Sequence, residues 1–169
     1  MPSIVEGNLT FEFSAGWEVS KLDEWSFYEN QFRRVCNGTK AVDILAVEPD
    51  LSSAWYIEVK DYRRHRRTKT IGVAEEIACK VRDSLGLVAA AQVRANDASE
   101  KGMAGFALRA RQINVVLHLE QPVKPSRLFP REIDLANVQQ RLRQLVRAID
   151  PHARVCERAQ MSGCAWTVR

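Results

Sequence analysis

The fold follows from one stretch of the sequence, residues 40–60, which reads KAVDILAVEPDLSSAWYIEVK. Its first part, residues 40–47, is an apolar run interrupted by Asp43. Its last part, residues 54–60, is rich in the aromatic and β-branched residues that favour strands. Between them, Pro49, Asp50 and two serines are typical of a turn. We therefore expect two antiparallel strands joined by a short hairpin.

Three charged residues interrupt these otherwise apolar strands. If the turn is centred near Leu51, Asp43 lies at the level of Glu58 and Lys60 on the second strand. Because side chains alternate along a strand, Glu58 and Lys60 share one face of the sheet. Ionised groups inside a sheet are costly unless they are paired or bound to a metal. The pattern therefore predicts two carboxylates and one ammonium converging on a small patch.

This combination of residue types is suited to phosphodiester hydrolysis. Two carboxylates can bind Mg²⁺, which prefers hard oxygen ligands and keeps several waters. The ion can polarise a phosphate oxygen and lower the pKa of a bound water. A neighbouring lysine can hold the attacking water and neutralise charge that develops in the transition state. We expect Asp43 and Glu58 to bind the metal and Lys60 to assist catalysis, with a purely structural ion pair as the alternative.

An aspartate on one strand, a short hairpin and Glu-x-Lys on the next strand resemble the signature of the PD-(D/E)xK, or restriction-endonuclease-like, nuclease superfamily. The resemblance covers about residues 40–61, and a helix and a strand follow in the expected order. It implies an α/β (α+β) fold with a restriction-endonuclease-like core, in which helices flank a mixed central sheet. It also implies Mg²⁺ as cofactor, with Mn²⁺ as a possible substitute.

The sequence departs from the superfamily pattern in two respects. A literal Pro-Asp occurs at Pro49-Asp50, but it lies near the turn tip, roughly 23 Å along the strand from Glu58; Asp43 is therefore the preferred ligand. Many members of the superfamily carry a further glutamate on an N-terminal helix, and Glu18 and Glu29 are the candidates here. Lys80, on the helix after the second strand, is an accessory candidate for the same site.

A basic segment follows Lys60 directly. Residues 60–69 hold six positive side chains and one negative side chain, and residues 1–58 hold 4 basic and 10 acidic ones. Basic side chains beside a metal site can neutralise phosphates and give salt-dependent binding. We expect the segment to contact nucleic acid through Arg63, Arg64, Arg66, Arg67 and Lys69.

The N-terminal third is harder to interpret. Residues 9–13 alternate like a short strand, and residues 16–24 fit either a short helix or an irregular strand. Residues 25–36 have helical spacing, but Asn37-Gly38 before the next apolar run is a strong hairpin signal. We favour a strand ending at Asn37; a glycine that ends a helix is the alternative.

The remaining elements are better defined. Apolar residues at helical spacing predict helices over residues 73–95 and 135–149, the latter starting after Asp134 and ending before Pro151. Residues 113–119 form a convincing strand, in which His118 is expected to be a core residue. In the tail, residues 154–156 and 165–168 are expected to pair with each other around Ser162-Gly163.

Composition sets the remaining expectations. The chain has 169 residues, 46% of them hydrophobic, which suits a single domain over residues 1–169. No apolar run approaches the roughly 20 residues that span a membrane, and the N-terminus lacks the features of a secretion signal. A cytoplasmic location is therefore expected. No cysteine pair has the close spacing of zinc ligands, so the four cysteines are expected to be reduced thiols.

Together these features predict a Mg²⁺-dependent deoxyribonuclease, more specifically an endonuclease. DNA is preferred over RNA as the expected substrate, and no membrane is involved. High sequence specificity would require homodimerisation or a partner subunit, since no separate recognition domain is evident. The alternative is a catalytically inactive nuclease fold that serves as a nucleic-acid-binding or protein-interaction subunit of a defence or repair complex.

Overall fold

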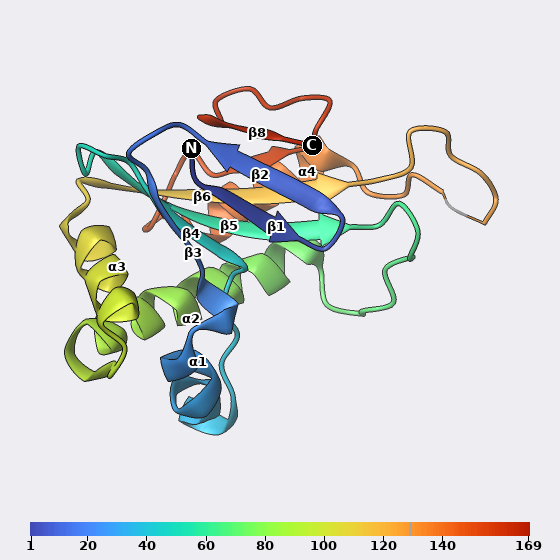
Figure 1. The fold of residues 1–169 in the computed structure, drawn as a ribbon. Coiled ribbons are helices and arrows are strands. Elements are labelled where there is room, and N and C mark those ends of the chain that lie inside the picture. Colours follow the sequence, from blue (N-terminus) through green and yellow to red (C-terminus); the bar gives the residue numbers. More distant parts are fainter. Residues whose placement is uncertain (129) are drawn as a thin grey trace.

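A five-stranded mixed sheet lies at the centre of the computed structural model, which describes residues 1–128 and 130–169. The antiparallel strands β3 (Glu18–Lys21), β4 (Ile44–Val47) and β5 (Ser53–Asp61) form one half of this sheet. In the other half, β5, β6 (Gln112–Glu120) and β7 (Arg154–Cys156) run parallel. Three further antiparallel strands form a smaller sheet across one face (Figure 1). The strand order of the central sheet is β3-β4-β5-β6-β7. The strands of the smaller sheet are, in order, β1 (Ser3–Glu6), β2 (Leu9–Phe13) and β8 (Trp166–Val168).

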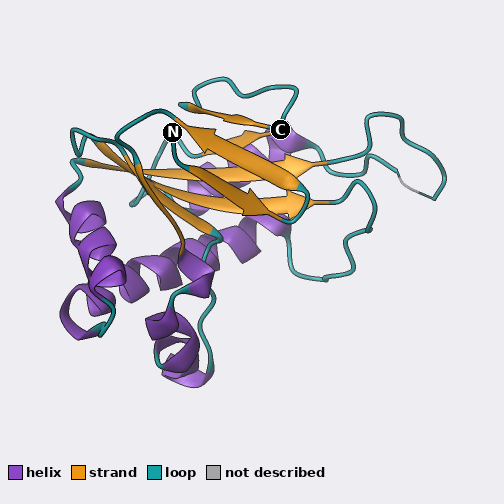
Figure 2. Cartoon of the chain, in the orientation of Figure 1, coloured by secondary structure: helices purple, strands orange, loops and turns teal. Residues whose placement is uncertain are grey.

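Helices cover the other face of the central sheet (Figure 2). They are α1 (Ser26–Asn30), α2 (Val73–Arg94), α3 (Ala98–Arg109) and α4 (Leu135–Leu145), with 3-10 helices at Leu22–Glu24 and Phe32–Asn37. None of the described helices has both the length and the apolar character needed to cross a membrane. The class is therefore mixed α and β, as the sequence predicts.

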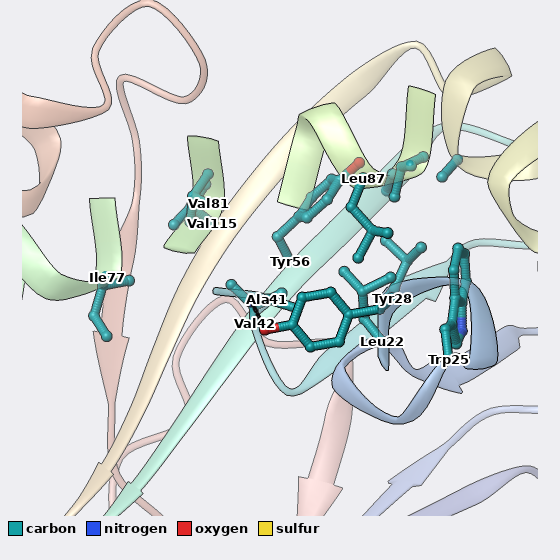
Figure 3. Close-up of a cluster of buried hydrophobic side chains, with 14 of the residues drawn as sticks. Leu22, Trp25, Tyr28, Ala41, Val42, Tyr56, Ile77, Val81, Leu87 and Val115 are labelled. Atoms are coloured by element: carbon teal, nitrogen blue, oxygen red, sulfur yellow. Dashed lines mark hydrogen bonds between the residues drawn. The ribbon is translucent and has the colours of Figure 1, made fainter. Parts of the chain in front are cut away.

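Two hydrophobic cores result from the alternation of side chains along β4 and β5. Ile44 and Ile57 belong to the core under the small sheet, whereas Leu45 and Tyr56 belong to the core under the helices. Figure 3 shows this helical-side core, with Tyr56 between the sheet and the residues of α2. The second core explains why β4 is apolar on both faces, since each face packs against another layer.

The predicted hairpin is present, but its strand pairing is shifted by one residue from that of a turn centred on Leu51. Ile44 pairs with Ile57, and continuing this register places Asp43 opposite Glu58. Asp50 lies in the turn, where it accepts a hydrogen bond from Ser52 N at 3.0 Å. The hairpin therefore brings Asp43, and not Asp50, to the level of Glu58.

The first strand of the hairpin is shorter than the predicted 40–47, because β4 begins at Ile44. The preceding backbone N–H groups bond to side chains of helices instead of to another strand. Lys40 N donates to Asp83 Oδ2 at 3.1 Å, and Val42 N donates to Ser84 Oγ at 2.9 Å. Helix α2 thus holds the chain at the point where it enters the sheet.

The prediction of a strand ending at Asn37 is wrong. Residues 26–30 form α1 and residues 32–37 form a 3-10 helix, so the helical spacing was the correct signal. Gly38, with φ 128°, follows the second helix as its C-cap, which is the alternative use of Asn37-Gly38. Burial of Trp25, Phe27 and Tyr28 against the helical-side core stabilises this short helical segment.

Three of the later elements occupy predicted segments, whereas helix α3 was not predicted. Helix α2 and strand β6 occupy the predicted segments, and Asp134 caps α4 by accepting from Ala136 N at 2.9 Å. Helix α4 ends at Leu145, earlier than expected. The tail prediction is wrong, because β7 pairs with β6 in the central sheet while β8 pairs with β2 in the small one.

Helix α1 depends on a carboxylate from α3, and this contact gives a stability prediction. Buried Glu100 accepts hydrogen bonds from Ser26 N at 2.5 Å and Phe27 N at 3.1 Å. We expect Glu100→Ala to lower the free energy of unfolding by about 2 kcal/mol, since two N–H donors lose a charged acceptor. Urea denaturation measures the change, with exposed Lys101→Ala as the matched control; equal stability of the two variants would contradict this role.

Candidate functional site

The hairpin and α2 build the candidate site from two carboxylates. Asp43 immediately precedes β4, and its Oδ2 accepts a hydrogen bond from Val59 N at 2.7 Å. Glu58 lies near the end of β5 on the face that α2 covers, and its side chain is completely buried. Glu58 is thus fixed within β5, and Asp43 is held at the entry to β4 by the backbone of β5, which favours a precise arrangement.

Two lysines hold the carboxylates together. Lys80 Nζ, from α2, lies 2.6 Å from Glu58 Oε1 and 3.6 Å from Asp43 Oδ1. Because both oxygens contact the same nitrogen, they can be no more than about 6.2 Å apart. Lys60 Nζ also contacts Glu58 Oε1. The Lys80 ammonium therefore occupies the position of a cation between the two carboxylates.

Glu58 is incompletely satisfied. Its Oε2 is buried and has no hydrogen-bond partner in the described part of the chain. Burial and the charge of Asp43 raise the pKa of Glu58 from 4.5 to about 7, although Lys80 and Lys60 oppose this change. A buried carboxylate oxygen without a partner is costly, and a further cation or a proton would stabilise it.

Glu76 orders the cations around the site. This buried residue from α2 lies with its Oε1 3.6 Å from Lys60 Nζ and its Oε2 2.9 Å from Arg67 Nη1, and it also contacts Lys69. Burial would raise the pKa of Glu76, but the hydrogen bonds from Lys69 and Arg67 and the charge of Lys60 lower it to about 2. Glu76 is therefore ionised at neutral pH and is a second acidic partner of Lys60, beside Glu58.

Lys60 remains a cation in this environment. Burial alone would lower the pKa of Lys60, but its contacts with Glu58 and the charges of Asp43 and Glu76 raise the pKa above its ordinary value. An ammonium of this kind donates hydrogen bonds and supplies positive charge. It is not suited to accept a proton at neutral pH.

The donor set fits a hard divalent cation with few protein ligands. Within residues 1–128 and 130–169, no group of three or more His, Cys, Asp or Glu side chains is arranged to hold a metal ion. Mg²⁺ commonly uses one or two carboxylates and completes its shell with water and substrate oxygens. The unpartnered Glu58 Oε2 and the nearby Asp43 carboxylate meet that requirement, provided that Lys80 moves aside.

The structure does not bring Glu18 or Glu29 to the site. Glu18 pairs with Val47 at the far end of β3 from Asp43, and Glu29 is on α1; both are exposed. The acidic residue that sequence reasoning missed is Asp23, whose Oδ1 is buried without a partner among the described residues. Burial and the charge of Asp43 raise the pKa of Asp23 from 3.8 to about 6.

The position of Asp23 follows from the β3–β4 pairing. Lys21 pairs with Ile44, and Leu22 N donates to Asp43 O at 2.9 Å, so Asp23 follows directly beside Asp43. A strand prediction for residues 18–21 would have indicated the position of Asp23, but the sequence left the structure of this segment undecided. Asp23 contributes negative charge near the site but does not complete a three-carboxylate group.

Most of the cations in the basic segment form ion pairs with acidic residues of the protein. Arg63 pairs with Asp61 at 2.6 Å, Arg66 pairs with Glu132, and Arg67 and Lys69 pair with Glu76. Arg64 differs, because it is exposed and no ion pair with a described residue involves it. Four of the five predicted cations therefore already have acidic partners within the protein.

A second loop lies next to the basic segment. Because β5 and β6 are parallel, the loops that follow them leave the same end of the sheet (Figure 1). The ion pair between Arg66 and Glu132 joins the two loops. The second loop also carries Lys124 and Arg127, both exposed, which the sequence analysis did not single out. This end of the sheet, beside Lys60, therefore presents cations from two loops.

Comparison with known proteins gives one partial similarity. The chain is 33% identical over 169 residues to a cysteine–tRNA ligase of Neisseria meningitidis serogroup A / serotype 4A (strain DSM 15465 / Z2491). The alignment covers 82% of this chain and 24% of that protein, so the chain spans about a quarter of the relative's length. No protein-family profile matches the chain, and no solved structure matches it.

Proposed function

We propose that this protein is a Mg²⁺-dependent nuclease that hydrolyses phosphodiester bonds, with Asp43 and Glu58 as metal ligands and Lys60 as a catalytic residue. The observation that carries the proposal is the buried Glu58 carboxylate, which keeps one oxygen without a partner beside Asp43. The strand aspartate and the Glu-x-Lys pattern are those that resemble the PD-(D/E)xK superfamily. DNA is the proposed substrate, and Mn²⁺ is a possible substitute for Mg²⁺.

The residues of the site have separable roles in this proposal. A bound Mg²⁺ would polarise the scissile phosphate and lower the pKa of a coordinated water. Lys60 Nζ donates hydrogen bonds to the attacking water and to a phosphoryl oxygen, which stabilises negative charge as it develops. Glu76 keeps Lys60 in place and ionised. Lys80 bridges the two carboxylates in the absence of the metal.

A second candidate function rests on Lys80. Because Lys80 Nζ already lies between Asp43 and Glu58, it can act as a permanent substitute for the metal. The protein would then bind nucleic acid, or a partner protein of a defence or repair complex, without cutting. The two candidates differ in whether a divalent ion can displace the ammonium.

The partial similarity to a tRNA ligase suggests RNA as a second possible substrate. That relative's name refers to tRNA, and the shared segment is about a quarter of its length. Transfer RNA is therefore a substrate to test beside DNA. The cations at the end of β5 and β6 neutralise phosphates of either polymer.

A cleavage assay distinguishes these candidates. Plasmid DNA, single-stranded DNA and tRNA are each incubated with the protein in Mg²⁺, Mn²⁺ or EDTA, beside Asp43→Asn. The nuclease proposal expects cleavage that requires the divalent ion and is lost in Asp43→Asn. If wild type and variant bind all substrates equally and cut none in either ion, the binding-subunit proposal replaces it.

Arg64 gives a prediction for the phosphate-binding surface. Since no described acidic residue pairs with Arg64, we expect its guanidinium to contact phosphate more directly than its neighbours do. Arg64→Ala should weaken binding of any sequence and reduce the slope of log affinity against log salt concentration by about 1. Fluorescence anisotropy at several KCl concentrations measures this slope. An unchanged slope in Arg64→Ala would show that the basic segment does not contact phosphate through this residue.

A further inference from the structure

A second polar cluster lies on the opposite face of the central sheet from Glu58 and Lys60. It contains His118 and Glu120 of β6, Cys156 of β7, and Cys164 just before β8. His118 pairs with Cys156 across the parallel strands, and His118, Glu120 and Cys156 are buried. Cys156 and Cys164 belong to the core between the two sheets, and nothing in the proposed function uses this cluster.

The distances within the cluster connect the two thiols to a base. Cys156 Sγ lies 3.8 Å from Cys164 Sγ and 3.6 Å from His118 Nδ1. His118 Nε2 lies 2.9 Å from Glu120 Oε1, which also accepts from Arg158 N at 2.6 Å. Burial would raise the pKa of Glu120, but the hydrogen bond from His118 lowers it, so Glu120 is a carboxylate. A carboxylate only accepts, so His118 Nε2 carries a hydrogen and Nδ1 faces the thiol.

We propose that Cys156 and Cys164 are a modification site for peroxides, at which oxidation forms a reversible disulfide with His118 as the base. The sulfur atoms need to approach from 3.8 Å to roughly 2 Å, a movement that side-chain rotation can provide. The bond would join the residue at the end of β7 in the central sheet to the segment leading into β8 in the small sheet. It would close a loop with seven residues between the two cysteines.

The reaction balances with one molecule of hydrogen peroxide. The Cys164 thiolate attacks one peroxide oxygen and the O–O bond breaks. The departing hydroxide takes up the proton that the Cys164 thiol released and becomes water. His118 Nδ1 then accepts the Cys156 proton, and the Cys156 sulfur attacks the sulfenic sulfur of Cys164. The S–O bond breaks, and the departing hydroxide takes the proton from His118 as a second water. Two thiols are oxidised and the peroxide is reduced.

The surroundings favour Cys164 as the first sulfur to react. It is partly exposed and lines a surface cavity of about 340 Å³, whereas Cys156 is buried. The hydrogen bond with Cys156 and the charge of Arg154 lower the pKa of Cys164, although burial opposes them. Its thiolate is therefore more available than that of Cys156, whose pKa is raised by the same hydrogen bond and by burial.

Mass spectrometry tests the proposal directly. Reduced protein is treated with hydrogen peroxide, its free thiols are alkylated, and it is digested with trypsin, which cuts after Arg158 and separates the two cysteines. We expect one disulfide-linked pair of peptides, 155–158 with 159–169, and a melting temperature roughly 5 °C higher than that of the reduced protein. Dithiothreitol should reverse both changes.

Variants test the roles of the individual groups. Cys164→Ser should abolish the linked peptides, whereas Cys79→Ser, at an exposed thiol of α2, should leave them unchanged. His118→Gln should slow disulfide formation at least about tenfold if it folds, as judged by circular dichroism. The proposal is overturned if peroxide modifies Cys36 and Cys79 without ever linking Cys156 to Cys164. Equal oxidation rates for His118→Gln and wild type would overturn the role of His118 as base.

Discussion

We expect Lys60→Met to lower the rate of Mg²⁺-dependent cleavage by roughly 1000-fold, because it would remove the hydrogen-bond donor that we propose acts on developing charge. Methionine has a similar length and suits the partly buried position. The measured quantity is the single-turnover cleavage rate at saturating Mg²⁺. We expect the variant to bind DNA nearly as well as wild type, since Lys60 is less accessible than the exposed loop cations Arg64, Lys124 and Arg127.

Lys101→Met is the matched control for this variant. Lys101 is an exposed lysine on α3, and no ion pair among the described residues joins it to Asp43 or Glu58. Its replacement changes the net charge by the same amount and should leave cleavage unaffected. A Lys60→Met protein that cuts as fast as Lys101→Met would remove Lys60 from the catalytic machinery.

We expect the affinity for divalent ions to fall about tenfold for each pH unit below 7, because a proton and the proposed metal would compete for Glu58. The pKa of Glu58 is about 7 in the folded protein and 4.5 in the unfolded chain. The folded state therefore binds more protons between these values, and Glu58 lowers stability as pH rises from 4.5 to 7, by on the order of 3 kcal/mol. Mg²⁺ should offset this loss above pH 7 and have little effect at pH 5.

Calorimetric titration with Mn²⁺ and thermal unfolding with Mg²⁺ measure the two parts of this prediction. Glu58→Gln should lose the pH-dependent affinity and the stabilisation by Mg²⁺. Glu29→Gln, at an exposed glutamate of α1, should keep both. Metal affinity that is independent of pH between 5 and 8 would mean that Glu58 is not a ligand.

The sequence was sufficient where local pattern and packing agree. In the hairpin, apolar alternation and turn residues together indicated the register, so Asp43 was placed at the level of Glu58 with an error of one residue in the pairing. Helix α2 has a long apolar stripe, and its length makes helical periodicity unambiguous. The placement of Lys80 near the carboxylates followed from the position of this helix.

Tertiary contacts decided the elements that the sequence did not specify. The segment 25–37 carried both helix and hairpin signals, and burial of its aromatic residues, with Glu100 binding the start of α1, favours the helix. The tail strands join separate sheets, a choice that depends on the exposed edges of β2 and β6 and not on their own sequence. Likewise, pairing of the basic segment with Glu76 and Glu132 depends on residues far along the chain.

The proposed metal site requires Asp43 and Glu58 to hold one divalent cation in place of the Lys80 ammonium. Anomalous diffraction from crystals of the protein grown with Mn²⁺ tests it most directly. We predict one strong anomalous peak within bonding distance of an oxygen of both carboxylates, with Lys80 Nζ displaced from its position 2.6 Å from Glu58. A structure at millimolar Mn²⁺ in which Lys80 still bridges Asp43 and Glu58, and no peak lies between them, would contradict the account.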